Sequence, residues 1–240
     1  MVTAIVLAAG KGSRMNSDIA KQYIRVCGKE ILYYSLRVFQ DCEAIDNIIL
    51  VVGKGDTDFC KESIIDAYGF DKVNKICEGG EQRYNSVYNG ILAAREIGNG
   101  DDDIVMIHDG ARPFVDNEMI LSLIDATKKF GASTLGVPVK DTIKIVDENL
   151  FGIETPDRKK LYQIQTPQTF KTGVIFNAYK SMFECANYNI TDDTMLIEQY
   201  GGVNAKIVMG SYKNIKITTP EDIEITEKFL QKNFKKCVDK

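Results

Sequence analysis

The sequence predicts an α/β fold with a doubly wound, mostly parallel sheet. Short β-branched runs such as TAIVLAA, NIILVVG and DIVMIHD recur along the chain, and stretches of helical period lie between them. These runs are apolar throughout instead of alternating with polar residues, which is typical of strands buried on both faces. Strands separated in this way by helices favour a parallel sheet covered on both sides.

The predicted elements follow one another in a regular order. Strands are expected over residues 3–9, 47–53, 72–77, 103–109 and 133–139. Helices are expected between them, over residues 30–40, 57–68, 84–97 and 118–130. Asp116 can cap the last of these helices, which would run to Gly131. The run TPED at 219–222 predicts another helix start, because it combines an N-cap, a first-turn proline and acidic residues in the first turn.

Residues 140–170 break the alternation and are surplus to a doubly wound sheet. The segment shows period-two alternation around a turn at 147–149 and has no helical period. Its apolar side chains must be buried somewhere, because an isolated hairpin is marginally stable. The side chains in question are Ile143, Ile145, Phe151 and Ile153. We expect one domain over residues 1–240 with 140–170 as an extended β-arm for dimerisation; the alternative is a flap over its own domain.

Composition bounds the class of protein. The 240 residues are 44% hydrophobic and 27% charged, so a full core is available, and the net charge of −4 argues against a broad nucleic-acid surface. The six cysteines are dispersed without a C-x-x-C pair, which favours reduced thiols in the cytoplasm. Apolar runs are too short for a membrane span, and no targeting segment or fused pathway enzyme is expected.

The stretch LAAGKGSRM follows the first predicted strand. A strand that leads into glycines places backbone N–H groups at the carboxyl end of a parallel sheet, where ligands bind and where such groups cradle phosphates. Met15 stands where a P-loop or a dinucleotide fingerprint would need glycine, so neither motif fits. Lys11, Arg14 and Lys21 remain around the glycine turn, and each cation about 4 Å from a phosphate oxygen contributes roughly 4 kcal/mol. The loop therefore favours a triphosphate; the alternative is an ordinary solvated loop.

LAAGKGSRM followed by KQY resembles the signature loop of the sugar-nucleotidyltransferase superfamily. Further motifs resemble those of its methylerythritol phosphate cytidylyltransferase family, which acts in non-mevalonate isoprenoid synthesis. These motifs are EGGEQRYNSVYNG, HDGARPF, KDTIK, TPDRKKLYQIQTPQTF, TDDT and NIKITTPED. The resemblance implies a Rossmann-like nucleotidyltransferase fold, a homodimer, and attack by a polyol phosphate oxygen on the α-phosphorus of CTP. A phosphate monoester is mostly dianionic at pH 7, so no general base is needed.

The resemblance assigns the nucleotide side of the site. Arg14, Lys21 and Lys216 are the expected catalytic cations, with Lys216 on a late strand. Mg²⁺ is expected to bridge the phosphates, and Asp109 is placed for this metal ion or for the ribose. The expected nucleotide-binding residues are Ala8, Ala9, Gly10, Gly12, Gly79, Gly80, Glu81, Ser86 and Asp109. Lys216 can instead be a solvent-facing strand residue, and Ser86 only a helix-start residue. His108 is expected to be a packed structural residue.

The resemblance also assigns an acceptor side. The expected substrate-binding residues are Arg112, Asp141, Thr142, Arg158, Thr166 and Thr191. Arg112 can instead brace the loop after its strand. The resemblance places Thr142 and Arg158 in the neighbouring subunit's site. Arginine suits this role because its planar guanidinium can bind a phosphate through two hydrogen bonds. Arg158 can instead pair with Asp157 or Glu154, Thr191 can cap the following helix, and Asp222 is expected only to cap.

Two other functions remain open from sequence. Ribitol phosphate cytidylyltransferase is a relative with the same chemistry, but it typically shows LAGGKG and DAVRPF where this chain has LAAGKG and DGARPF. A non-catalytic nucleotide-sensing module would keep the fold without the reaction. The presence of both expected catalytic lysines, Lys21 and Lys216, argues against it.

Overall fold

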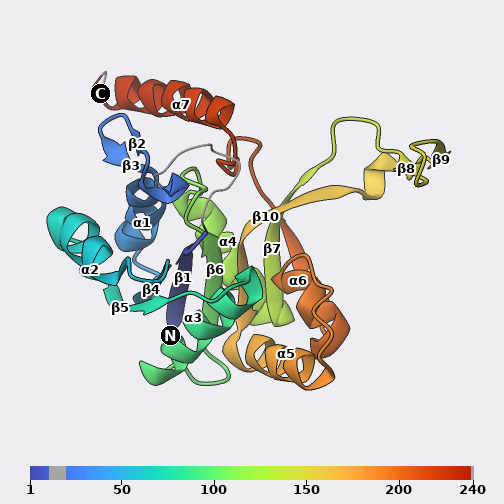
Figure 1. The fold of residues 1–240 in the computed structure, drawn as a ribbon, viewed down its shortest axis with the longest axis horizontal. Helices are drawn as coiled ribbons and strands as arrows, with labels where there is room; N and C mark the ends of the chain where they lie inside the picture. The colour runs from blue at the N-terminus through green and yellow to red at the C-terminus, as the bar shows by residue number, and fades with distance from the viewer. Residues whose placement is uncertain (11–19, 239–240) are drawn as a thin grey trace.

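The protein is built around a seven-stranded sheet with strand order β11-β7-β10-β6-β1-β4-β5. The structure, a computed structural model, describes residues 1–10 and 20–238, with side chains up to residue 231. The strands of this sheet are β1 Val2–Ala8, β4 Asn47–Val52, β5 Val73–Glu78, β6 Ile104–Asp109, β7 Ala132–Pro138, β10 Tyr162–Lys171 and β11 Lys206–Met209. All pairings are parallel except those of β10, which runs antiparallel to β6 and β7 (Figure 1). The predicted doubly wound, mostly parallel sheet is confirmed.

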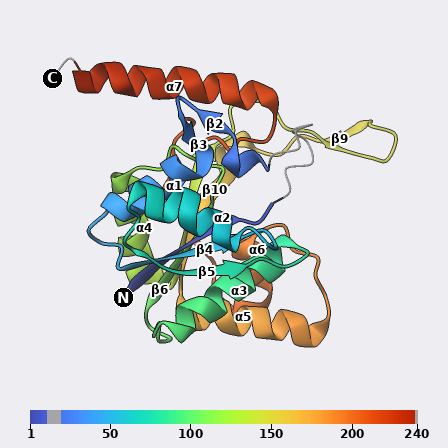
Figure 2. The same cartoon turned by 60° about the vertical axis from the view of Figure 1, so that its left-hand side comes forward.

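Helices cover both faces of the sheet. The first face packs against α1 Ile31–Asp41, α2 Thr57–Cys60 with its π-helical continuation Lys61–Asp66, and α4 Asn117–Phe130. The second face packs against α3 Arg83–Glu96, α5 Thr172–Cys185, and α6 Asp193–Leu196 with its π-helical continuation Ile197–Gly201. Figure 2 shows the two groups of helices on opposite sides of the strands.

The strand β1 shows why the sequence runs are continuously apolar. Ala4, Val6 and Ala8 belong to the core on the first face, whereas Ile5 belongs to the core on the second face. Because successive side chains of a strand point to opposite faces, both sets must be apolar when both faces are covered. Because β1 lies inside the sheet between β6 and β4, its carboxyl end lies beside the carboxyl ends of these two parallel strands.

The predicted helix ends are also found. The Asp116 carboxylate accepts a hydrogen bond from the Met119 N–H at 2.9 Å, and α4 stops at Gly131, whose φ of 86° favours glycine. The last helix, α7 Pro220–Val238, begins at the predicted proline. Asp222 accepts from the backbone N–H groups of Thr218 and Thr219 at 2.8 and 2.9 Å, so its predicted capping role is confirmed.

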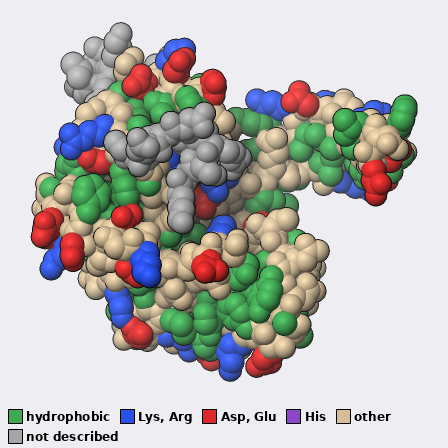
Figure 3. All heavy atoms as spheres, viewed as in Figure 1, with side chains coloured by type: hydrophobic (Ala, Val, Ile, Leu, Met, Phe, Trp, Pro, Cys, Tyr) green, Lys and Arg blue, Asp and Glu red, His purple; other side chains and the backbone are tan. Residues whose placement is uncertain are grey.

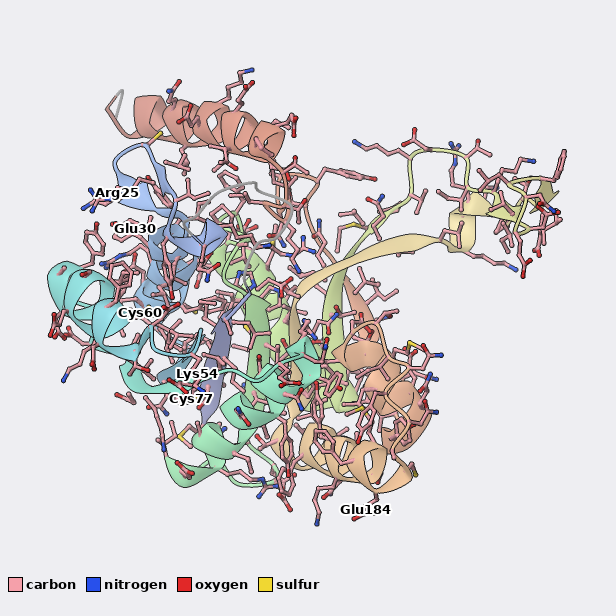
Figure 4. The ribbon with its side chains drawn as sticks, in the orientation of Figure 1. Arg25, Glu30, Lys54, Cys60, Cys77 and Glu184 are labelled. Atoms are coloured by element: carbon pink, nitrogen blue, oxygen red, sulfur yellow. The ribbon has the colours of Figure 1, made fainter. Side chains whose placement is uncertain are left out.

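The helix α7 lies over a small hairpin outside the main sheet. The hairpin strands are β2 Arg25–Val26 and β3 Lys29–Glu30, which precede α1. Val26, Ile31, Ile217 and Leu230 form a third apolar cluster that joins the hairpin, α1 and α7. Figure 4 labels Arg25 and Glu30 on this hairpin, where the Arg25 Nε lies 2.8 Å from the Glu30 Oε1.

The predicted β-arm is present but shorter than expected. A hairpin of β8 Ile145–Val146 and β9 Gly152–Glu154 projects from the body, followed by the 3₁₀ turn Arg158–Lys160 (Figure 1). The prediction that the arm extends to residue 170 is wrong, because β10 begins at Tyr162 and lies inside the sheet between β6 and β7. Period-two alternation is common to arm strands and sheet strands, so the pattern alone did not separate them.

In the described ranges, no helix combines the length and the apolar character that a membrane crossing requires.

Candidate active site

A cavity of about 620 Å³ opens at the carboxyl ends of β1, β5 and β6. This is the edge at which open α/β sheets bind ligands. Its described lining residues are Leu7, Ala9, Gly10, Lys21, Gln22, Gly80, Glu81, Gln82, Arg83, Ser86, Asp109, Ala111 and Lys216. The predicted nucleotide-binding and catalytic residues in this lining thus gather from five separate segments of the chain, and a polyanion would meet both backbone and cations.

The end of β1 forms one wall of the cavity. Ala9 and Gly10 line it, and Ala8 is buried behind them with its carbonyl accepting a 2.6 Å hydrogen bond from the Gln22 side chain. This bond joins β1 to the 3₁₀ turn Lys21–Tyr23, although residues 11–19 separate them in sequence. Three predicted residues, Lys11, Gly12 and Arg14, lie outside the residues that the structure describes.

The loop after β5 forms the opposite wall and requires its glycines. A Cβ on Gly79 would lie 2.5 Å from the Ala9 Cβ and 2.6 Å from the Ser86 Oγ, so no larger residue fits between the two walls. The buried Ser86 hydroxyl accepts from the Gly80 N–H at 3.1 Å and donates to the Gln82 carbonyl at 3.3 Å. Gln82, not Ser86, occupies the N-cap of α3. Ser86 therefore shapes the glycine loop in addition to lining the cavity.

Asp109, at the end of β6, is the centre of charge. Its carboxylate lies 2.8 Å from the Lys216 Nζ, 3.6 Å from the Arg112 Nε and 3.7 Å from the Arg83 Nε. Burial opposes ionisation of Asp109, but the three cations together hold its pKa well below the usual range. The carboxylate stays charged at every physiological pH, and the cations around it remain in excess.

Lys21 and Lys216 lie on different segments that a hydrogen bond joins at the cavity. The Lys21 Nζ donates to the Ile217 carbonyl at 3.1 Å, and Lys216 precedes that residue. The expectation that Lys216 lies on a late strand is wrong: residues 210–219 form no strand. Their backbone groups bond to separate partners instead, for example the Ile217 N–H to the Ala111 carbonyl at 2.9 Å and the Asn214 carbonyl to Arg112 at 2.9 Å.

A second cavity, of about 170 Å³, adjoins the first. Its described lining residues are Arg83, Asp109, Arg112, Ile164, Gln165, Thr166, Gln168, Thr191, Asp192 and Lys216. Three residues, Arg83, Asp109 and Lys216, line both cavities. The predicted acceptor residues Arg112, Thr166 and Thr191 are therefore brought together beside the nucleotide residues, with two cations and one anion at the boundary.

The Thr191 alternative as a helix cap is wrong. Asp192 is the N-cap of α6 and accepts from the Met195 N–H at 2.9 Å, while the Thr191 hydroxyl contacts only the Met195 sulfur at 3.5 Å among the described residues. Aspartate is preferred over threonine at an N-cap, and its negative charge also interacts favourably with the helix N-terminus. Thr191 is exposed at the rim of the second cavity.

His108 is a packed structural residue, as predicted. It is fully buried, with its ring 5.1 Å from the ring of Phe39. Its Nε2 lies 3.0 Å from the Arg112 carbonyl, so Nε2 carries the proton and Nδ1 accepts from the Thr166 hydroxyl at 3.2 Å. The same hydroxyl accepts from the Asp109 N–H at 3.1 Å. The network fixes Thr166 and the turn after β6 at the back of the second cavity.

The predicted arm residues do not reach the chain's own site. Asp141, Thr142 and Arg158 are exposed and line neither cavity. The Arg158 guanidinium donates to the Lys140 carbonyl at 2.7 Å, and neither predicted alternative partner, Asp157 or Glu154, pairs with it in the described part of the chain. Figure 3 shows the arm projecting from the body with apolar side chains on its surface.

Sequence reasoning named Arg83 only as part of the segment expected at the cytosine and ribose, and it missed the pairing of Arg83 with Asp193. Arg83 lies within EGGEQRYNSVYNG, and Asp193 within TDDT, but neither motif indicates that they meet. The Arg83 guanidinium donates to the Asp193 carboxylate at 2.8 Å, and Asp193 is fully buried. The sequence offers one signal for these residues, namely a charged residue inside each motif. It does not indicate that the two residues pair, because they lie 110 positions apart and meet only in the folded chain.

The residues present suit a magnesium ion only when it arrives with phosphates. Among the described residues no cluster of three or more His, Cys, Asp or Glu side chains is placed to hold a metal ion. Asp109 supplies one carboxylate at the cavity boundary. Because Mg²⁺ keeps several waters and binds through one or two carboxylates plus substrate phosphates, a single carboxylate is a sufficient protein ligand for it.

Comparison with known proteins gives one consistent family. The sequence model described as "2-C-methyl-D-erythritol 4-phosphate cytidylyltransferase" matches residues 2–232. A relative so named in Clostridium botulinum (strain Eklund 17B / Type B) is 49% identical over 95% of this chain and 98% of its own. Another in Clostridium novyi (strain NT) is 47% identical over 98% of both chains. The crystal structure of a 4-diphosphocytidyl-2C-methyl-D-erythritol synthase from Anaerococcus prevotii superimposes with a TM-score of 0.81 at 35% identity, over 96% of each chain.

Proposed function

Because the chain belongs to the 2-C-methyl-D-erythritol 4-phosphate cytidylyltransferase family, we propose that it joins CTP to 2-C-methyl-D-erythritol 4-phosphate in the non-mevalonate isoprenoid pathway. An oxygen of the acceptor phosphate attacks the α-phosphorus of CTP, the bond from that phosphorus to the β-phosphate bridging oxygen breaks, and pyrophosphate leaves. The product is 4-diphosphocytidyl-2-C-methyl-D-erythritol. The ribitol phosphate and sensor alternatives are not favoured, since the relatives named above carry the methylerythritol activity.

The observation that carries this proposal is the boundary between the two cavities. A reaction that joins two phosphates needs both anions in adjacent sites with cations where they meet. The larger cavity accommodates CTP and the smaller one the acceptor phosphate, and Arg83 and Lys216 line both. The cations offset the repulsion of the anions and stabilise the extra charge of the transition state.

The division of work among the residues is proposed from the family resemblance together with the positions of the described residues; Arg14 rests on the resemblance alone. The backbone of Ala8, Ala9 and Gly10 at the end of β1 and the backbone of Gly79 and Gly80 would lie along the nucleotide, where the closely packed glycines leave room for a pyrimidine. Lys21 and Arg14 stabilise the leaving pyrophosphate, and Lys216 contacts the α-phosphate. Asp109 orients Lys216, whose Nζ is 2.8 Å away. No described side chain is required as a base, because the acceptor phosphate is already ionised.

Magnesium is proposed as the cofactor. Bound with CTP, it would neutralise phosphate charge and hold the triphosphate in one conformation, with Asp109 as its protein ligand. Asp109 already compensates cations in the protein, so a metal ion would compete with Lys216 and the arginines for the same carboxylate.

A homodimer through the arm is the proposed assembly. Leu150, Phe151 and Ile153 at the arm tip are 81%, 70% and 66% exposed, which is unusual for large apolar side chains that are close together. A partner subunit would cover them and receive Asp141, Thr142 and Arg158 at the rim of its acceptor cavity.

A cytoplasmic location is proposed as well. The described cysteines, including Cys60 and Cys77 in Figure 4, form no disulfide bond, which is typical of proteins in a reducing compartment.

The proposed activity is tested by pyrophosphate release. The purified protein with Mg²⁺ and CTP is offered 2-C-methyl-D-erythritol 4-phosphate or ribitol 5-phosphate, and ATP and GTP replace CTP as controls. We expect release only with CTP and the methylerythritol substrate. Turnover of ribitol 5-phosphate at the same rate would assign the other acceptor, and CTP binding without turnover of either acceptor would make the protein a sensor.

A further inference from the structure

Asp193 is a buried carboxylate whose charge is fully compensated. It is 0% exposed, its Oδ2 accepts from the Arg83 guanidinium at 2.8 Å, and its Oδ1 accepts from the Tyr179 hydroxyl at 2.5 Å. Its own N–H donates to the Gln168 side chain at 3.1 Å. A buried charge is costly unless it is paired and hydrogen-bonded, and here each oxygen has a donor in place.

The partner of this carboxylate lies where the two cavities meet. Arg83 lines both of them, and its Nε lies 3.7 Å from the Asp109 carboxylate, beyond hydrogen-bonding distance. Among the described residues, the hydrogen bond to Asp193 is the one that orients the guanidinium. Arginine is always protonated in proteins and carries five N–H donors, so the guanidinium keeps N–H groups for substrate oxygens beyond those that Asp193 binds.

The ion pair also connects the loops that carry the two substrate sites. Arg83 begins α3 directly after the glycine loop on the nucleotide side. Asp193 begins α6 directly after Thr191 and Asp192, which line the acceptor cavity. Tyr179, from α5, is fully buried and holds the carboxylate from behind.

We propose that Asp193, supported by Tyr179, is a positioning residue that holds the Arg83 guanidinium between the two substrates, so that Arg83 contacts the incoming acceptor phosphate. This inference rests on the proposed function. It specifies the acceptor phosphate as the group that Arg83 contacts, and it gives Asp193 and Tyr179 roles that neither the sequence motifs nor the cavity linings assign.

Chemical rescue by guanidinium ion tests the role of Asp193. Arg83→Ala lowers the turnover rate on the order of 100-fold, as for other lost charge-stabilising donors. Guanidinium chloride at non-denaturing concentration should restore activity to Arg83→Ala, because Asp193 remains to bind the ion. The double variant Arg83→Ala/Asp193→Asn should show no such recovery. Equal rescue of both proteins, or rescue of neither, overturns the inference.

A milder variant keeps the test open if Asp193→Asn fails to fold. Tyr179→Phe removes one donor to the carboxylate and preserves the shape, so we expect kcat/KM for the acceptor to fall about 10-fold while the KM for CTP is unchanged. Tyr88→Phe is the matched control: its ring centroid lies 5.8 Å from that of Tyr179, and its hydroxyl has no hydrogen bond within the described residues. Identical kinetics for the two variants would refute the inference.

Failure of the proposed function and failure of the positioning role give different results. If the unmodified protein releases no pyrophosphate with CTP and methylerythritol phosphate, the function is wrong. If the unmodified protein is active and the rescue and Tyr179→Phe results are negative, only the positioning role is wrong.

Discussion

Acidification from pH 7.5 to pH 5 should destabilise this protein through its one histidine, His108. Burial lowers the pKa of His108 from its ordinary value near 6.5 to about 4; the neighbouring Asp109 opposes the shift. The unfolded chain therefore takes up a proton near pH 6.5, whereas the folded protein does not until near pH 4. Stability is complete above pH 6.5 and is lost progressively as the pH falls towards 4.

The magnitude follows from the two pKa values. Between pH 7.5 and pH 5, a group with an unfolded pKa of about 6.5 and a folded pKa of about 4 lowers the free energy of unfolding by about 2 kcal/mol. The geometry gives the same sign, because protonated Nδ1 can no longer accept the 3.2 Å hydrogen bond from Thr166. A charged ring would also face Arg112 and Lys216, which disfavour it.

Urea unfolding at pH 7.5 and pH 5 measures the effect, with His108→Gln as the comparison. The glutamine amide can still donate to the Arg112 carbonyl but does not titrate. The variant is expected to be less stable at pH 7.5 because packing against Phe39 is lost, yet its stability should change by about 2 kcal/mol less than that of the unmodified protein between the two pH values. Carboxylates that titrate in this range are common to both proteins and cancel. An equal pH dependence for the two proteins would refute the reasoning.

Three further results are expected. Lys21→Ala should lower the turnover rate on the order of a thousandfold if it stabilises transition-state charge, and a nearly normal rate would remove it from the mechanism. Subunits carrying Arg158→Ala, mixed with Lys21→Ala subunits, should recover part of the activity in hybrid dimers, because one site type would then be complete; proven mixing without recovery means that each subunit is self-contained. Chelation of divalent cations with EDTA should stop pyrophosphate release and added Mg²⁺ should restore it, whereas full activity in EDTA would exclude a metal requirement.

The two adjoining cavities explain why the proposed reaction needs no acid–base chemistry from individual side chains. Three residues at their boundary, Arg83, Asp109 and Lys216, are linked by charge, and each comes from a different part of the chain. The Asp109 carboxylate is mostly buried, whereas the Arg83 and Lys216 side chains remain about one third exposed to the cavities, so the cations can still meet a substrate. An enzyme that only has to bring two ionised phosphates together can rely on such fixed charge.

Most of the fold could be predicted from the sequence, because the signals for its elements are local. Continuous apolar runs such as the one in β1 indicated strands buried on both faces, and Asp116 and Gly131 marked the ends of α4. The glycines at 79 and 80 and the cations Lys21 and Lys216 were found from their motifs. The structure places Gly80, Lys21 and Lys216 in the lining of one cavity and packs Gly79 against Ala9 and Ser86, which line it too.

Only the tertiary structure decided how distant segments meet. The strand β10 enters the sheet between β6 and β7, although its sequence resembles the arm that precedes it. Asp192 rather than Thr191 caps α6, and Arg83 pairs with Asp193 across the molecule. Periodicity and capping depend on neighbours a few residues away, whereas strand order and buried charge pairs depend on which long-range contacts give the lowest free energy. The amino-acid sequence therefore determined the elements and the chemistry available, and the fold determined which groups face the substrates.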